Sequence, residues 1–345
     1  MREDTKDIYS QVTDRIVRHL EEGVRPWQQP WTGGDPGIPA RHNGNAYRGV
    51  NILLLWLEAL SRGYTSPTWL TYKQALIEGG KVRPGERGSM VVFAKPVTVT
   101  ASNGKDEKDE KTEKRVRLLR YYTVFNVEQI DGLPDSFNVK LPEPLPVEKR
   151  VASAEDFVKA TAAVVRHGGV QAFYSPSEDF IQMPPFERFK DAESYYATLL
   201  HELTHWTRHK SRLNRDFGQK QQGDPTYAFE ELVAEIGAAF LCTHIRITPV
   251  IRDDHASYID FWLKALKDDN RAIIRAASLA QEAVDYLQQV QPSHANPTSE
   301  TDPLPGSGPA IADHPSRAAT DGAQRPPKTR QRKAKRIGKP APEPA

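Results

Sequence analysis

The chain has 345 residues, a formal net charge of +2 at pH 7 and one cysteine, Cys242. This length accommodates two ordinary domains, and the single cysteine excludes an internal disulfide and fits a reducing cytoplasm. There is no run of 18 apolar residues and no apolar signal core near Met1, so we expect a cytoplasmic protein without a membrane span. Because the net charge is small, any surface for nucleic acid must come from local patches.

The first predicted elements are helices. Residues 5–22 repeat apolar side chains every four positions, and residues 51–62 are rich in leucine, so both segments predict helices with one buried face. Thr71 and Gln74 have the spacing of a capping box, which predicts the start of a further short helix. Gly79 and Gly80 then predict its end.

Two predicted strands follow. Residues 90–100 and 116–125 are rich in β-branched and aromatic side chains, which favours strands. The mixed-charge residues 103–115 between them predict a solvated loop. We therefore expect an N-terminal α/β domain over residues 1–132, followed by a proline-rich linker over residues 133–150.

The second half of the chain is predicted to be mostly helical, as a domain over residues 151–290. Its first helix is expected over 153–166, and residues 179–183 predict a strand that Pro184 and Pro185 end. Further helices are predicted over 192–209, 225–243, 256–268 and 270–290. Residues 291–345 are rich in proline and end in a basic cluster, so we expect a disordered basic tail.

The helix predicted over 192–209 carries the pattern His201-Glu202-Leu203-Thr204-His205. Residues four positions apart lie on the same face of a helix, so the two imidazoles can bind one metal ion. Glu202 is adjacent and can act as a general base toward the attacking water. The pattern predicts a metallopeptidase-type zinc site, with manganese as the alternative metal.

A third ligand is expected from the helix that Asp224 and Pro225 begin, because aspartate and proline are favoured at a helix start. Glu231 and Glu235 share one face of that helix. We assign Glu231 as the ligand and Glu235 as the carboxylate that supports a ligating histidine, and the reverse assignment stays open. Glu230 is expected on a different face.

Two less specific readings of these residues remain. The metal site can be structural, without peptide turnover, and the histidines and glutamates can be incidental on two solvated helices. The strand predicted over 179–183 precedes the metal helix and fits an edge strand that pairs with an extended peptide. An ordinary structural strand fits that position nearly as well.

Both halves of the sequence resemble one family, the ArdC-type antirestriction proteins of conjugative plasmids, which are related to TraC-type primases. The second half resembles the family's zincin-like domain in the stretches 201–207, 211–213 and 230–241. The first half resembles the family's single-stranded-DNA-binding domain in the stretches 26–31, 47–51, 69–75 and 125–130. The resemblance implies a two-domain α+β protein that binds single-stranded DNA, holds a metal and protects incoming DNA from restriction.

Single strands are held by aromatic side chains that stack on bases and by cations along the backbone. The first half of the chain interleaves both types. The residues that we predict to contact DNA are Trp27, Trp31, Tyr47, Arg48, Trp69, Lys73 and Arg83. The expected partners are therefore single-stranded DNA and an unidentified protein or peptide substrate. The rival functions are a non-enzymatic DNA-coating protein with a structural metal site and, more weakly, a primase.

Overall fold

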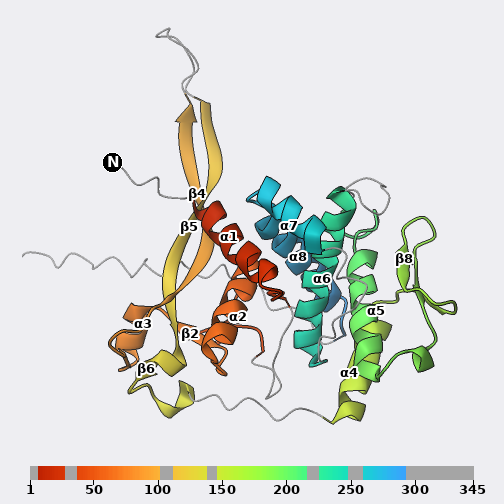
Figure 1. Cartoon of the computed structure of the whole chain (residues 1–345), viewed down its shortest axis with the longest axis horizontal. Helices are drawn as coiled ribbons and strands as arrows, with labels where there is room; N and C mark the ends of the chain where they lie inside the picture. Colours follow the sequence, from red (N-terminus) through yellow and green to blue (C-terminus); the bar gives the residue numbers. More distant parts are fainter. Residues whose placement is uncertain are drawn as a thin grey trace, which may run out of the picture. The chain divides into compact units, whose positions relative to one another are not determined.

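The computed structural model describes residues 7–27, 37–101, 112–137, 146–215, 225–247 and 259–292. Residues Met1–Asn296 form one compact unit. Both halves contain strands, and most of the long helices lie in the second half (Figure 1), so the predicted α+β class is confirmed. The predicted basic tail lies outside the described residues after Pro292. No described helix is long and apolar enough to cross a membrane.

A four-stranded sheet organises the first half. Its order is β1 (Ala40–Arg41), β2 (Thr68–Leu70), β5 (Thr112–Asn126) and β4 (Ser89–Ala101). Strand β1 pairs with β2 in parallel, and the other pairs are antiparallel. Strands β4 and β5 run together as a long hairpin (Figure 1). Because β5 begins at Thr112, the predicted charged loop is shorter than 103–115.

Helices α1 (Ile8–Glu21) and α2 (Val50–Arg62) supply most of the apolar side chains that this half buries. The carboxylate of Asp7 accepts a hydrogen bond from the backbone N–H of Ser10 and caps α1, since a helix start leaves its first N–H groups without partners. Helix α2 ends at Gly63, which adopts the left-handed conformation that glycine accepts at little energetic cost.

A smaller cluster forms around helix α3 (Tyr72–Ile77). Thr71 and Gln74 form both hydrogen bonds of the predicted capping box, which confirms it. A two-stranded sheet of β3 (Lys81–Val82) and β6 (Ile130–Asp131) lies beside this helix, and two 3₁₀ turns, Val127–Gln129 and Asp135–Phe137, flank β6. The buried side chains of this cluster are Leu70, Ala75 and Ile130.

The second half opens with helix α4 (Val147–Ala160). We predicted this helix over 153–166, so its start falls inside the predicted linker. Pro146 explains the earlier start, because its fixed φ suits the position before a helix. A three-stranded sheet follows, with the order β7 (Val165–His167), β9 (Phe180–Met183) and β8 (Phe173–Ser175).

Four helices complete the second half: α5 (Ala192–Trp206), α6 (Pro225–Ile245), α7 (Ile259–Asp268) and α8 (Ala272–Gln289). Helix α6 packs against each of the other three. Asp191 caps α5 by accepting a hydrogen bond from the N–H of Ser194 at 2.7 Å. Helix α5 ends before the predicted end at His209, because the chain folds back and the N–H of Leu213 donates to the carbonyl of Thr207.

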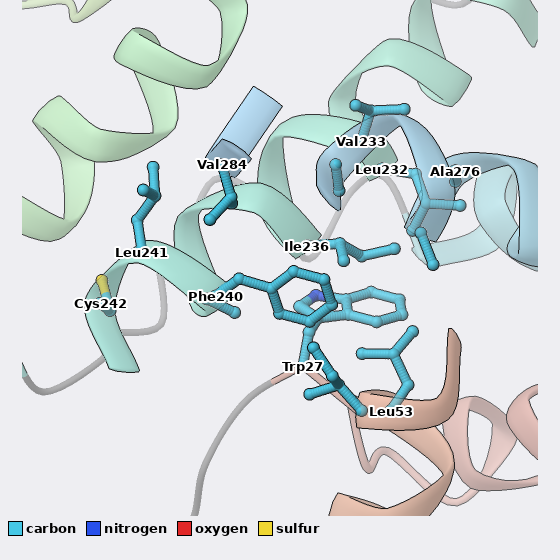
Figure 2. Packing of buried hydrophobic residues seen from close by; sticks show 14 of the residues in the cluster. Trp27, Leu53, Leu232, Val233, Ile236, Phe240, Leu241, Cys242, Ala276 and Val284 are labelled. Atoms are coloured by element: carbon cyan, nitrogen blue, oxygen red, sulfur yellow. The ribbon is translucent and has the colours of Figure 1, made fainter. Parts of the chain in front are cut away.

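One hydrophobic core joins the two halves of this unit. The rings of Trp27 and Trp262 meet edge to face with centroids 5.5 Å apart, and Trp56 meets Phe240 in the same way at 5.7 Å. Figure 2 shows Trp27, Leu53 and Phe240 among the buried side chains of this core. The predicted linker at residues 133–150 therefore divides the sequence into two halves whose side chains pack in one hydrophobic core.

Helices α5 and α6 approach closely at Gly237. A Cβ atom added there would lie 2.6 Å from Cγ2 of Thr204 and 3.0 Å from its Oγ1, and Thr204 is fully buried. Since real Cβ atoms do not approach other atoms to 2.6 Å, a side chain at residue 237 would force the two helices apart.

We expect Gly237→Ala to lower the free energy of unfolding by about 1–3 kcal/mol, because overpacking a tight core strains both helices. Adding Thr204→Ala should recover part of this loss, because it removes the two atoms nearest to the new methyl group. Urea unfolding of both single variants and the double variant measures the coupling. Strictly additive effects would contradict the proposed contact.

Candidate metal centre

Helix α5 presents His201 and His205 on the same face toward α6. Both side chains are buried, with residue exposures of 3% and 8%. Their Nε2 atoms are 3.1 Å apart, and the ring planes meet at 79°. Each imidazole therefore directs the same ring nitrogen at one point between the two helices.

Helix α6 places Glu231 opposite these nitrogens. One carboxylate oxygen of Glu231 lies 3.4 Å from Nε2 of His201, and the other lies 3.4 Å from Nε2 of His205. Within the described ranges, these three side chains form a group whose ligand atoms all lie within 4.8 Å of one another. Two imidazole nitrogens and a carboxylate are a donor set that suits a divalent metal ion, so the residues fit the metal that the sequence predicts.

The opposite nitrogens of the two imidazoles also face carboxylates. Nδ1 of His201 lies 3.3 Å from Oε1 of Glu235, and Nδ1 of His205 lies 3.1 Å from Oε1 of Glu230. An Nδ1–H that donates to a carboxylate fixes the tautomer that leaves Nε2 free to bind a metal. In this geometry Glu231 faces both Nε2 atoms, and Glu235 lies behind His201.

Glu230 lies outside the group of three candidate ligands, as expected, but it also contacts His205. Consecutive residues of a helix point about 100° apart, but α6 is buried on nearly all sides. Glu230 and Glu231 can therefore both reach His205 from neighbouring positions, one toward each ring nitrogen. The sequence signal that could have revealed this is the mostly apolar composition of residues 228–241, because it leaves little solvated surface for either carboxylate.

The carboxylates dominate the electrostatics of this cluster. Burial lowers the pKa of His205, but the charge of Glu231 and a hydrogen bond to Glu230 outweigh burial and raise this pKa to about 10. Burial also lowers the pKa of His201, and hydrogen bonds to Glu231 and Glu235 outweigh it in the same way. Burial raises the pKa of Glu231, but the two imidazoles hold it well below its usual value. The cluster therefore stabilises positive charge at its centre.

Glu202 follows His201 on α5 and is also buried, at 3% exposure. Glu202 is adjacent in sequence to the candidate ligand His201, but it does not belong to the group of three candidate ligands. A purely structural site has no use for such a group, whereas hydrolysis needs a base there. Glu202 is therefore a candidate base next to the ligand set.

The strand predicted to lie at an edge, 179–183, is instead the middle strand β9 of its sheet. Strand β8 lies at one edge of this sheet and, like β9, contacts α5. An extended peptide can add only to a strand with unpaired backbone groups. A peptide that pairs with this sheet beside α5 would therefore pair with β8 (Phe173–Ser175) rather than with residues 179–183.

The turn between β8 and β9 is fastened to the segment after α5. Arg212 forms two hydrogen bonds with the carboxylate of Asp179, one of them 3.0 Å long, and a third with Tyr174. The guanidinium also lies over the ring of Trp206, 3.8 Å from its centroid. Asp179 has a positive φ of 55°, which aspartate tolerates better than most residues. This clamp fixes the edge of the sheet relative to the metal helix.

The residues predicted to contact DNA fall into two groups. Trp27, Tyr47 and Trp69 are buried, with 1%, 3% and 1% exposure. Their rings belong to the hydrophobic core, so none offers a face on which a base can stack in this conformation. This burial corrects the prediction for these three, because the same bulk and apolarity that suit stacking also suit a core.

Arg48, Lys73 and Arg83 are all exposed, so their predicted contact with DNA stays a prediction. Arg48 forms an ion pair with Asp285, and Arg83 forms ion pairs with Glu86 and Asp131. Trp31 lies outside the described residues. Among the described residues, Tyr72 and Tyr121 have exposed rings on which a base can stack, whereas the rings of Trp27 and Trp69 are buried.

Comparison with known proteins agrees with the fold and the site. Residues 152–279 match a family described as zincin-like metallopeptidase, which is the class that the two histidines and the glutamate on adjacent helices define. Residues 6–125 match the N-terminal domain of the anti-restriction factor ArdC. The chain belongs to the ArdC antirestriction family.

Two solved structures of the ArdC protein from the R388 plasmid are similar to this chain. The metal-free structure shares 44% identity and a TM-score of 0.70, with coverage of 83% of this chain and 98% of that one. The Mn(II)-bound structure shares 42% identity and a TM-score of 0.68, with coverage of 84% and 99%. A divalent metal ion is therefore supported for this family and site, which agrees with the cluster of donors described above.

The chain is also similar in sequence to two other kinds of protein. A protein of Sinorhizobium fredii, y4eC, is 41% identical over 289 residues and is covered to 92% of its length. A DNA primase TraC of Escherichia coli is 37% identical over 313 residues. The chain spans 27% of that primase and 20% of a second TraC, so most of each primase has no counterpart in the match.

We expect acid to weaken the clamp at Asp179. A hydrogen bond from Arg212 holds the pKa of Asp179 below its usual value, so the clamp contributes stability above the unfolded pKa of about 3.9 and loses it as the pH falls through the folded pKa. Between pH 7 and pH 3, the Tm of Asp179→Asn should therefore fall less than that of the wild type. Glu178→Gln, one residue away, is the control. Parallel Tm profiles for the wild type and Asp179→Asn would count against the clamp.

Proposed function

We propose that this protein is an antirestriction factor that binds single-stranded DNA through its first half and holds a divalent metal in a peptidase-type site in its second half. The observation that carries the proposal is the convergence of His201, His205 and Glu231 beside Glu202, in a chain that covers nearly all of a solved ArdC protein. Its place of action is the cytoplasm, where DNA transferred by conjugation meets restriction enzymes.

His201, His205 and Glu231 are the proposed ligands. Glu235 and Glu230 are proposed to hold the two imidazoles by their Nδ1 atoms. Zinc is the metal that we favour for a site with two histidines and one glutamate. Manganese stays an alternative, because carboxylate ligands suit it and a related ArdC has been seen with Mn(II).

The proposed reaction is peptide hydrolysis. A divalent cation at this site supplies a Lewis acid that polarises the scissile carbonyl and lowers the pKa of water. Glu202 then acts as the general base, accepting a proton from the attacking water and delivering it to the departing amine. The outer edge of β8 is proposed to hold an extended peptide by backbone hydrogen bonds beside α5.

The proposed DNA surface rests on exposed residues of the first half. Lys73 follows Tyr72, whose ring is exposed, at the start of α3, and Arg83 follows β3. A cation next to an aromatic ring is the combination that single strands require. Because Arg83 is already paired with Glu86 and Asp131, we expect Lys73 to contribute more to affinity than Arg83.

Two rival functions remain distinguishable. A DNA-coating protein with a structural metal site would need the three ligands but not Glu202. A primase would need a metal site suited to nucleotide polymerisation, and the sequence contains no acidic motif of that kind. The chain also spans about a quarter or less of the TraC primases that it matches.

Glu202→Gln tests the peptidase proposal. The change keeps the shape of the side chain but removes the base, so peptide hydrolysis should fall about 10²–10⁴-fold while metal content and DNA binding stay unchanged. Metal analysis beside His201→Ala, which should lose the metal, establishes the site itself. Glu187→Gln, on the exposed turn before α5, is the matched control. If Glu202→Gln protects incoming DNA from restriction in cells as well as the wild type does, hydrolysis is not how this protein evades restriction.

Fluorescence anisotropy tests the DNA-binding proposal. Binding to a labelled single strand should be tighter than to duplex and should weaken steeply with salt, because phosphate contacts release counterions. Lys73→Ala should reduce the slope of log K against log salt by about 0.7. Lys264→Ala, an exposed lysine on α7, should leave it unchanged. Equal affinity for single strands and duplex would remove the basis for the assignment.

A further inference from the structure

A buried arginine lies behind the metal centre. Arg215 is only 5% exposed, and its guanidinium forms two hydrogen bonds to the carboxylate of Glu230. Nε donates to Oε2 at 3.0 Å, and Nη2 donates to Oε1 at 2.9 Å. This paired geometry matches the planar guanidinium to the planar carboxylate and is among the strongest contacts between side chains.

The same carboxylate reaches the metal centre. Oε1 of Glu230 lies 3.1 Å from Nδ1 of His205, so the same oxygen atom contacts both Arg215 and His205. The result is a continuous chain from Arg215 through Glu230 to His205, and Nε2 of His205 faces Glu231. All of these side chains are buried, so water does not screen their charges.

Arg215 also fastens the end of the helix that carries both histidines. Nη2 donates to the carbonyl of Thr204 at 3.0 Å, and Nη1 donates to Oγ1 of Thr207 at 3.1 Å. The last carbonyl groups of a helix lack partners within the helix. A cation at this end also interacts favourably with the helix dipole. Arg215 therefore contacts both the side chain that orients His205 and the backbone beside His205.

The turn after α5 explains how Arg215 reaches this position. The N–H of Arg215 donates to the carbonyl of Arg208, and the N–H of Asn214 donates to that of His209. Asn214 has a positive φ of 48°, which asparagine adopts more readily than most residues. The chain thus doubles back on the end of α5. Arg212, in the same turn, is bound instead to Asp179.

We propose that Arg215 is a positioning residue of the metal centre, which holds Glu230 against Nδ1 of His205 and thereby directs Nε2 of His205 at the metal. The proposal rests on the proposed metal site and extends it to a residue that does not touch the metal. Glu202, Glu230 and Glu231 bring three carboxylates into one buried region. Arg215 offsets their charge at Glu230, since a buried carboxylate without a partner is strongly destabilising.

Lysine cannot replace arginine in this role. A lysine ammonium is a point charge on a flexible stem and cannot donate in parallel to both oxygens of Glu230 while it also reaches Thr204 and Thr207. The position therefore requires the shape of the guanidinium as well as its charge. Arg212→Lys is the matched control, because Arg212 is a second clamping arginine of the same turn that contacts neither the ligands nor Glu230.

The experiment measures metal affinity rather than activity. Dissociation constants for Zn²⁺ and Mn²⁺ are obtained by competition with a chromophoric chelator for the wild type, Arg215→Lys, Arg215→Met, Glu230→Gln and Arg212→Lys. We expect the Arg215 and Glu230 variants to bind each metal about 10–100-fold more weakly, as for other groups that orient a ligating histidine. Arg212→Lys should bind with wild-type affinity.

Two further measurements separate positioning from folding. The Arg215→Met/Glu230→Gln double variant should lose about as much affinity as one single variant, because both changes break the same chain of contacts. The absorption bands of bound Co²⁺ should shift in the Arg215 variants and stay unchanged in Arg212→Lys. If Arg215→Met does not fold, Arg215→Lys and Glu230→Gln still decide the question.

The outcomes that overturn the proposal are distinct from those that overturn the metal site. Unchanged dissociation constants in folded Arg215→Lys and Glu230→Gln, even with a lower Tm, would make Arg215 merely structural. Equal losses of affinity in Arg212→Lys would do the same. A wild-type protein that binds neither metal, or a His201→Ala variant that binds as well as the wild type, would instead remove the proposed metal site itself.

Discussion

The close contact of helices α5 and α6 at Gly237 and Thr204 is the constraint on which the metal centre depends. The donor atoms of His201, His205 and Glu231 belong to two helices, and side chains of this length reach a common point only if the helix axes are near each other. The outer contacts of the two imidazoles, at 3.1–3.3 Å, are equally sensitive to the separation. A glycine facing a buried threonine permits that separation.

Periodicity made part of this site predictable. Residues four positions apart on a helix must share a face, so the pairing of His201 with His205, and of Glu231 with Glu235, follows from sequence alone. The contact of Glu230 with Nδ1 of His205 was not predicted, because it depends on how α6 packs against α5. Arg215 could not be predicted at all, since it lies in an irregular turn whose path depends on backbone hydrogen bonds and on the positive φ of Asn214.

The aromatic residues of the first half illustrate a different limit. Helix and strand positions there were largely predictable, as the capping box at Thr71 and the apolar face of α1 demonstrate. Composition could not decide whether a tryptophan faces solvent or the core, because burial depends on partners far away in the sequence. Trp27 packs on Trp262, more than 200 positions further along, and no local pattern encodes that contact.

The shared core of the two halves has a thermodynamic consequence. Because Trp27 and Trp56 pack on side chains of α7 and α6, neither half can unfold without exposing apolar surface of the other, so the halves should melt in a single cooperative transition. A ligand that binds only the folded state of one half then stabilises both. Metal bound between α5 and α6 would in this way keep the distant β4–β5 hairpin folded, and a DNA strand held by the first half would slow the loss of the metal.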